Sequence, residues 1–344
     1  MESVFNRLTM AAALIVLTFI SSTASASKAR VNSLQGAIGL YDTQTIFTQP
    51  AYIHKLNPYV TYEFGSTAVA GSPKAEGGFL LSREGNKWGA YLGHQSPYQN
   101  GLRAIGTYQR QDNPIDIFFG KNNWATSVSI SSSEDENTGA KQTTLIGKFG
   151  MINDRDGGQD EFYGTLELLA NAEKPNNTYR GAPVLNLGYL RRSGELTYGA
   201  DVAYGDGNHD NAGSKKLKYT SLAGAINHRP IAELYYGVAF GYETLEQEGQ
   251  KREIIALPFS IGLEKDMFSW MTVRGSVRQN ILLGSSKNEI AGTRAEKNLN
   301  NTSVAMGLGF KHNGFVFDGT MAAGTSGDLN ATTFLTTASM TYSF

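Results

Sequence analysis

Hydrophobic and polar residues alternate with a period of two at the C-terminal end of the chain. Counting back from Phe344, every second position as far as Phe334 is aromatic or apolar, apart from Thr336, and nearly all positions between them are serine or threonine. Successive side chains of a β-strand point to opposite faces. The pattern therefore predicts a strand with one apolar and one hydroxylic face, as in a transmembrane barrel or at the edge of a soluble sandwich.

The same alternation recurs along most of the chain. The clearest rows cover residues 161–168, 195–204, 232–243, 302–311 and 315–321. Each row sets aromatic or aliphatic residues against carboxylates, glycines or other small or polar residues. Tyr198 and Tyr204, and likewise Tyr236 and Tyr242, flank apolar centres, which is typical of aromatic girdles at two membrane interfaces.

The connections between the predicted strands alternate between short turns and longer loops, as in outer-membrane barrels with short periplasmic turns. This predicts an all-β, antiparallel, up-and-down transmembrane barrel of about 16 strands, or 14 if one pair is miscounted. Pro258 interrupts a predicted strand and indicates a bulge or an irregular rim. The turns include 153–159, 228–231 and 265–268, and the loops 67–75, 97–113, 132–140, 171–181, 205–215, 244–251, 285–300 and 324–330.

Residues 1–26 have the pattern of a secretory signal peptide. Arg7 precedes an apolar run, and Ala24-Ser25-Ala26 fits a signal-peptidase site that cleaves between Ala26 and Ser27. The apolar run has 13 residues, whereas a spanning helix needs about 20. An N-terminal anchor is the alternative. No later run is long enough to span as a helix, so only a closed barrel could place the mature chain in a membrane.

Composition narrows the possible classes further. Charged residues make up 18% of the 344 residues, against about 25% in a typical soluble domain. The net charge of −1, without a basic stripe, argues against nucleic-acid binding. The chain has no cysteine, which excludes disulfides, cysteine-ligated zinc, iron–sulfur clusters, thiol catalysis and a lipid-modified cysteine.

The chain end resembles a known targeting signal. Phe344 is the last residue, and Tyr342 and Met340 precede it at alternating positions. This arrangement is similar to the assembly signal of Gram-negative outer-membrane barrels. The resemblance implies insertion by the barrel-assembly machinery, outer-membrane lipid as the surrounding medium, and an outer-membrane location.

The segment before the first strand (59–64) lacks the period of two. In residues 36–56, Asp42 is followed by Ile46 and Phe47 and then by Gln49-Pro50-Ala51. This resembles the N-terminal motif of FadL-type fatty-acid transporters and related PorV-type barrels, although their step is Asn-Pro-Ala and their glycine-rich stretch is longer. In that family, which commonly has 14 strands, the segment folds into the lumen.

The resulting organisation is a signal peptide (1–26), an N-terminal lead-in or plug segment (27–56) and a barrel (57–344). A plug is what the resemblance implies, and a periplasmic or lumen-lining lead-in is the alternative.

Enzymatic functions lack the necessary residues. His94 lies two residues before Ser96, but no orienting partner or oxyanion donor is evident. Asp206, His209 and Asp210 have the residue types of a rim protease but lie in a sequence typical of turns. We expect no enzymatic activity, no metal site and no cofactor.

The face opposite the apolar rows should line a wet lumen, where its charges select solutes or simply pair with one another. Acidic residues outnumber basic ones on it, so we expect a passive channel for small hydrophilic solutes with weak cation preference. Alternatives are a plugged transporter of hydrophobic compounds and a non-conducting structural or surface protein; homo-oligomers are possible. The predicted lumen residues are Glu63, Asp116, Lys148, Glu161, Glu167, Glu195, Asp201, Glu233, Glu243, Arg274, Arg278, Lys311 and Asp318.

Overall fold

The computed structural model describes residues 27–65, 75–105, 108–181, 183–210, 214–290, 293–297, 301–323 and 337–344. Its helical elements are α2 (Lys28–Ser33), the 3₁₀ turns η1 (Thr45–Phe47) and η2 (Pro50–Lys55), and α3 (Pro97–Ile105). The described residues include no helix that is both long enough and apolar enough to cross a membrane.

The strands are β1 (Tyr59–Phe64), β2 (Glu76–Arg83), β3 (Asn86–Leu92), β4 (Ile115–Lys121), β5 (Trp124–Asp135), β6 (Ala140–Arg155), β7 (Gly158–Lys174), β8 (Asn177–Gly181), β9 (Val184–Ser193), β10 (Leu196–Asp210), β11 (Ser214–Ile231), β12 (Leu234–Gln247), β13 (Gln250–Phe268), β14 (Met271–Asn288), β15 (Thr293–Lys297), β16 (Ser303–His312), β17 (Phe315–Ala323) and β18 (Thr337–Ser343).

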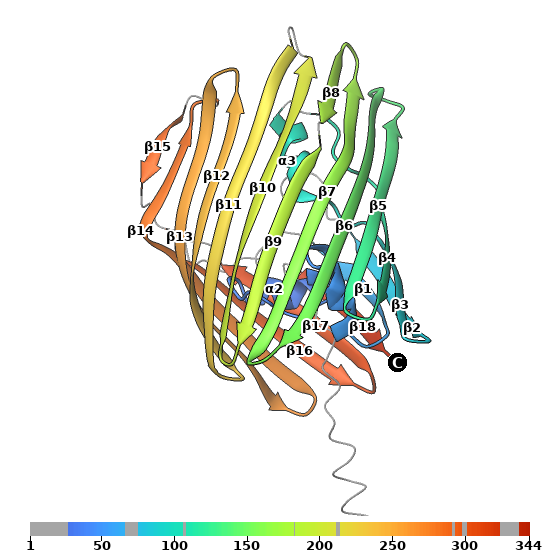
Figure 1. Cartoon of the computed structure of the whole chain (residues 1–344), viewed down its shortest axis with the longest axis vertical. Coiled ribbons are helices and arrows are strands. Elements are labelled where there is room, and N and C mark those ends of the chain that lie inside the picture. The colour runs from blue at the N-terminus through green and yellow to red at the C-terminus, as the bar shows by residue number, and fades with distance from the viewer. Residues whose placement is uncertain are drawn as a thin grey trace, which may run out of the picture.

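The strands close into a single antiparallel barrel (Figure 1). β1 pairs with β2 on one side and with β18 on the other, which joins the two ends of the sheet. β8 and β9 both lie between β7 and β10, and β15 and β16 both pair with β14. The 18 strand segments therefore fill 16 positions, which confirms the predicted fold class and the larger of the two predicted counts.

The alternating pattern separates the two faces of the wall as predicted. In β18, Thr337, Ser339 and Thr341 face inward and are buried, whereas Tyr342 and the following Phe344 are 39% and 58% exposed. Exposed large apolar side chains occur in this way around the ring, from Tyr62 in β1 to Phe317 in β17. A soluble protein would bury such residues, so this belt is suited to contact with lipid.

The strands are longer than the alternation predicted. Most residues of the predicted loops 132–140, 171–181, 205–215, 244–251 and 285–300 belong to paired strands, and 97–113 contains α3. The predicted turns 153–159, 228–231 and 265–268 are mostly strand too. Away from lipid both faces are polar, so the hydrophobic period vanishes while backbone pairing continues. The predicted loop 324–330 and residues 67–74 of the loop 67–75 lie outside the described residues.

Pro258 marks an irregular position, as predicted. The pairing of β13 with β14 shifts register between Ala256 and Pro258. Proline has no N–H to donate to the neighbouring strand, so a bulge accommodates it.

Tyrosine rings cover glycines on the inner face of the wall. Tyr163 in β7 lies opposite Gly188 in β9, where a Cβ atom would collide with the ring. The same arrangement pairs Tyr235 with Gly262. The glycine leaves space against which the ring packs, so these cross-strand pairs fix neighbouring strands in register.

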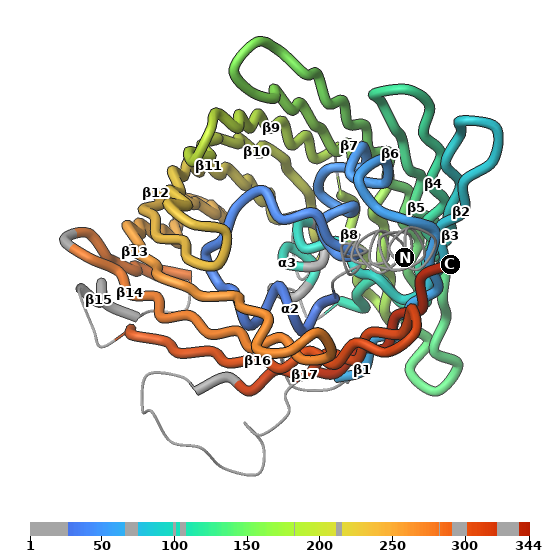
Figure 2. The backbone as a smooth tube through the Cα atoms, turned by 90° about the horizontal axis from the view of Figure 1, so that it is seen from below, coloured from blue at the N-terminus to red at the C-terminus, as the bar shows by residue number. Residues whose placement is uncertain are grey.

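Two segments lie inside the ring. Seen from the end with the short turns, residues 27–56 (blue) occupy the interior, with α3 behind them (Figure 2). The short turns mark the periplasmic end, so α2 lies in the periplasmic half and α3 in the external half (Figure 1).

The tyrosine–glycine pairing predicts a difference between two lumen-facing glycines. Gly188→Ala should lower the free energy of unfolding by about 1–3 kcal/mol, because the added methyl group overpacks the site against Tyr163. A Cβ at Gly241 would have no atom within 4 Å, so Gly241→Ala is the matched control. Urea unfolding in phospholipid vesicles measures both, and equal stability of the two variants would contradict the packing role.

Candidate functional site: the lumen and its N-terminal segment

The structure places the predicted lumen residues on inward-facing strand positions or in the adjoining turns. They differ in exposure and in their position along the barrel. Those with less than a tenth of their surface exposed are Glu63, Asp116, Lys148, Glu161, Glu167, Arg274 and Asp318. Asp201, Glu243 and Arg278 are more exposed, and Glu195, Glu233 and Lys311 lie at the periplasmic rim. Arg274 and Arg278 differ in environment, since Arg274 lies within a buried ion network and Arg278 is exposed.

The N-terminal segment begins with a short capped helix. The Ser27 hydroxyl caps α2 by accepting a hydrogen bond from the Arg30 N–H at 3.3 Å, and it donates one to the Asp318 carboxylate at 2.8 Å. Ser27 was predicted as the first residue after signal cleavage, and Ala26 lies outside the described residues. The first described residue is therefore bonded directly to the wall strand β17.

A buried ion network holds this helix against the wall. The Arg30 guanidinium donates two hydrogen bonds to Glu264, at 2.7 and 2.8 Å. Arg274 contacts the same Glu264 at 2.8 Å and Asp318 at 2.5 Å. Arg30 also approaches Asp42 of its own segment at 3.5 Å. Burial raises the pKa of the Asp42 carboxyl to about 7, against the opposing effect of Arg30.

A second set of contacts fixes the segment to β1 and β2. The Lys28 ammonium lies 2.5 Å from Glu76, and the Lys28 backbone N–H donates to Glu63 at 3.1 Å. His94 approaches Glu76 at 3.4 Å and stacks on the Phe47 ring with centroids 3.5 Å apart. The helix α2 and the turn η1 thus meet at Glu76, which contacts Lys28 directly and Phe47 through His94.

The 3₁₀ turns form a small apolar core against β1–β6. Ile46, Phe47, Tyr52 and Ile53 pack there with wall residues such as Phe118. Two inward-facing glycines, in β4 and β6, permit this approach. A Cβ at Gly120 would lie 2.7 Å from the Ile53 side chain, and one at Gly150 would collide with Gln49. This packed cluster fills the side of the periplasmic mouth lined by β1–β6.

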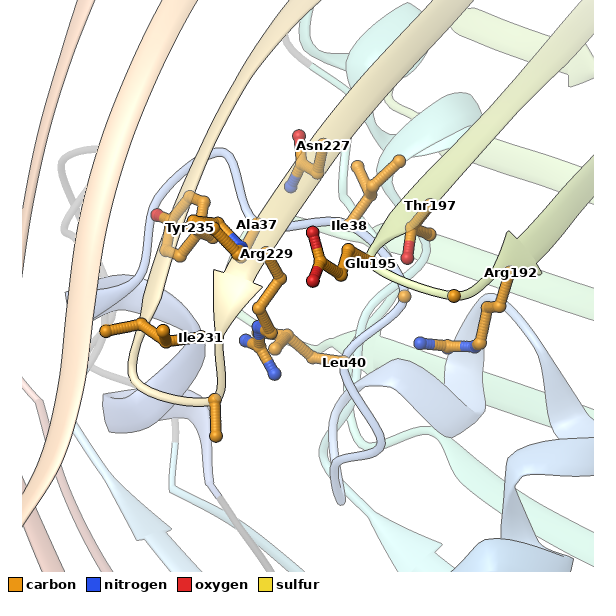
Figure 3. Close-up of a pocket in the computed structure, with 14 residues that line it drawn as sticks. Ala37, Ile38, Leu40, Arg192, Glu195, Thr197, Asn227, Arg229, Ile231 and Tyr235 are labelled. Atoms are coloured by element: carbon orange, nitrogen blue, oxygen red, sulfur yellow. The ribbon is translucent and has the colours of Figure 1, made fainter. Parts of the chain in front are cut away.

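The opposite side of the mouth is crossed by residues 35–41, which we call the arch. Tyr235 donates to the Gln35 carbonyl at 2.9 Å, and Asn227 donates to the Gly36 carbonyl at 3.1 Å. At the far end of the arch, the Arg192 guanidinium lies over the Tyr41 ring, 4.2 Å from its centroid. Residues of the arch line two pockets of 330 and 530 Å³, the smaller shown in Figure 3.

The external half of the lumen is lined differently. Arg103 of α3 is buried and donates to Thr144 at 2.9 Å and to the Thr143 carbonyl at 3.1 Å. Ser96, before α3, donates to Glu167. An apolar cluster adjoins α3 and consists of Leu102, Tyr108, Ala172, Tyr179, Leu217 and Leu245.

Sequence reasoning missed several charged residues of the site. Arg30 and Glu76 lie in or beside segments that have no regular alternation. Arg192 and Glu264 lie near strand ends, beyond the apolar rows that identified the inward face. Continuing the period of two to the turns would have placed Glu264 inward, since its neighbour in β14 is Arg274.

The residues considered for catalysis are engaged elsewhere. Ser96 donates to Glu167, while His94 contacts Glu76 and Phe47. His209 lies within β10, with its Nε2 atom 2.9 Å from Gln247.

A closed antiparallel wall, an apolar outer belt and a charged interior together define an outer-membrane β-barrel. The protein lies in the outer membrane, with the belt in contact with lipid and the lumen residues away from it.

A scan against protein-family models finds no match, and a search of the curated proteins finds none. Similar solved structures include CdiB from Escherichia coli (8% identity, TM-score 0.48, covering 84% of this chain and 63% of that chain). Others are OmpT of Vibrio cholerae in its trimer form (9%, 0.43, 83% and 98%) and the Ralstonia pickettii toluene transporter TbuX (11%, 0.38, 94% and 99%). The chain spans 60–63% of the length of the two CdiB structures.

The ion network predicts that Arg30→Gln releases the N-terminal segment. The change leaves Asp42 and Glu264 with one fewer cation; because the Arg30–Glu264 pair is only partly buried, its loss should cost less than the about 3–5 kcal/mol of a fully buried pair. Hydrogen exchange of residues 28–56 should accelerate while the strands stay protected. Arg252→Gln breaks a pair that is more than one-third exposed on both sides and serves as the control. Unchanged protection in Arg30→Gln would show that the network does not hold the segment.

Proposed function

We propose that the protein is a passive outer-membrane channel for small hydrophilic solutes, rather than an enzyme. In this proposal the N-terminal segment confines passage to the side of the periplasmic mouth between β9 and β14. The observation that carries the proposal is the asymmetry of that mouth. One side is filled by the apolar core of η1 and η2, and the other has two pockets with charged walls.

Barrel size supports a channel. Barrels of 16 strands are wide enough to leave an aqueous lumen, whereas smaller ones are filled by side chains. A segment of thirty residues that packs against one part of the wall narrows such a lumen without needing to fill it. The arch contributes mostly small or apolar residues, so the charges facing the pockets come chiefly from the strands and from Arg30.

The charge of the mouth changes the expected ion preference. The expectation of weak cation preference counted only the positions opposite the apolar rows. The two pockets are lined by six basic residues and four acidic ones. The basic residues are Arg30, Lys55, Arg192, Arg229, Arg274 and Lys311, and the acidic residues are Glu195, Glu233, Glu264 and Asp266. We therefore propose weak anion preference for solutes that pass this mouth.

Transport of hydrophobic compounds is the second candidate function. The apolar cluster beside α3 is the observation that favours it, because its buried side chains form an apolar packing site inside the lumen. Binding of a hydrophobic fluorescent probe that Leu217→Gln abolishes would support this alternative. Probe binding that is unchanged in Leu217→Gln would count against transport of hydrophobic compounds.

Removal of residues 28–56 should raise single-channel conductance in planar bilayers by at least about twofold, because a 16-strand barrel without an insert is a wide pore. Recordings of the full chain in a KCl gradient measure ion preference directly. Heat-dependent mobility in electrophoresis checks that the shortened chain still forms a barrel. Gly150→Leu should displace η2 and therefore also raise the single-channel conductance, which makes this variant a second test. Equal conductance of all three well-folded proteins would contradict a narrowing role, and a full chain without conductance would contradict the channel.

A further inference from the structure

The smaller pocket combines positive charge with an apolar wall. It is lined by the arch, by the last residues of β9 and β11 with the turns that follow them, and by the first residues of β10 and β12. Arg192 and Arg229 enter it from two different strands, with Leu40 between them (Figure 3). Ile38, Leu40, Pro230 and Ile231 provide an apolar surface on the same pocket.

The Arg229 guanidinium is available to a ligand. It makes no hydrogen bond or ion pair with any described residue, although its backbone N–H donates to the Glu195 carbonyl at 2.8 Å. The charges of Arg30 and Arg192 repel it, and that of Glu264 attracts it. An added negative charge would therefore find Arg229 unpaired in a net positive field.

The other charges of the pocket are already engaged. Arg192 donates to Glu161 at 2.7 Å, which leaves its outer nitrogen atoms beside Tyr52 and the arch. A Cβ placed at Gly39 would lie 2.7 Å from one of those nitrogen atoms. Glu195 is directed to His228, at 2.8 Å, and its side chain is 62% exposed.

The arch supplies backbone donors at the same place. Gly39 has φ +68°, a conformation that glycine adopts without strain. The N–H groups of Ile38, Gly39 and Leu40 donate to no acceptor among the described residues, and Leu40 is only 6% exposed. Buried N–H groups normally have partners, and consecutive free N–H groups around such a turn are suited to anions.

From this combination we infer that the pocket is a binding site for a small organic carboxylate with a short apolar body. The carboxylate meets Arg229, the outer edge of Arg192 and the free N–H groups of the arch. Its apolar body packs on Leu40, Pro230 and Ile231. Guanidinium groups bind carboxylates through paired, charge-assisted hydrogen bonds. Binding itself is independent of the proposed channel, whereas its role as a solute-selecting step depends on that proposal.

Isothermal titration calorimetry of the full chain in detergent micelles tests the site by measuring its affinity for three probes: 3-methylbutanoate, acetate and inorganic phosphate. We expect 3-methylbutanoate to bind more tightly than the other two, because only it can use both the guanidinium groups and the apolar wall. Arg229→Gln should weaken its binding by about tenfold or more, since a hydrogen bond to a charged group is lost. Glu195→Gln should tighten it severalfold by removing a negative charge from the pocket.

Arg83→Gln is the matched control, because Arg83 is also near the periplasmic end but its side chain is 84% exposed outside the pocket. The affinity of Arg83→Gln for 3-methylbutanoate should equal that of the unmodified chain. The opposite effects expected for Arg229→Gln and Glu195→Gln cannot both arise from misfolding. Equal affinity in these two variants, or phosphate binding as tightly as 3-methylbutanoate, would overturn the assignment. A conducting protein that binds none of the probes would overturn the site and leave the channel standing.

Discussion

The structure depends on one set of interactions, the buried ion pairs between the N-terminal segment and the wall. Arg30, Glu264, Arg274 and Asp318 lie within hydrogen-bond distance of one another in a chain of contacts. Charged groups away from water are costly unless they are paired. Without Arg30, the wall would contain two inward carboxylates with only Arg274 to balance them. The wall and the segment therefore complete one another.

This pairing makes the periplasmic mouth asymmetric. From α2, which is fixed near β17, the chain passes around the lumen before it reaches β1, although β1 lies only two strand positions from β17. It does so through the arch and returns through η1 and η2, whose side chains pack on β1–β6 because Gly120 and Gly150 leave room for them. The remaining space lies beside the arch, where the pockets and the unpaired Arg229 are found. The proposed channel and the proposed carboxylate site both follow from this one arrangement.

The barrel could be predicted from sequence because lipid imposes a simple rule on each strand. Residues such as Tyr342 and Thr341 must face lipid and the lumen respectively, and this requirement produces the period of two along the chain. The rule fails where both faces are polar, which is why strands such as β10 and β11 extend well beyond the predicted boundaries.

The lumen charges could be predicted as a set, but their partners could not. Arg30 approaches Glu264, 234 residues later in the chain, and no periodicity connects them. The fold of α3 into the lumen depends similarly on contacts between Arg103 and β6. Such contacts are set by the curvature of the closed wall, which brings distant strands to face one another.

Disulfide formation tests the docked position of the N-terminal segment most directly, because the chain has no cysteine of its own. A Cβ at Gly307 of β16 would lie 2.7 Å from the Ser33 Cβ, close enough for a disulfide after a small adjustment. Cysteines at positions 33 and 307 should oxidise to a disulfide in native outer membranes, identified by mass spectrometry of the linked peptides, whereas cysteines at 33 and 241 should remain free. Two free thiols at positions 33 and 307, in a barrel that folds normally, would contradict the docked segment and the account built on it.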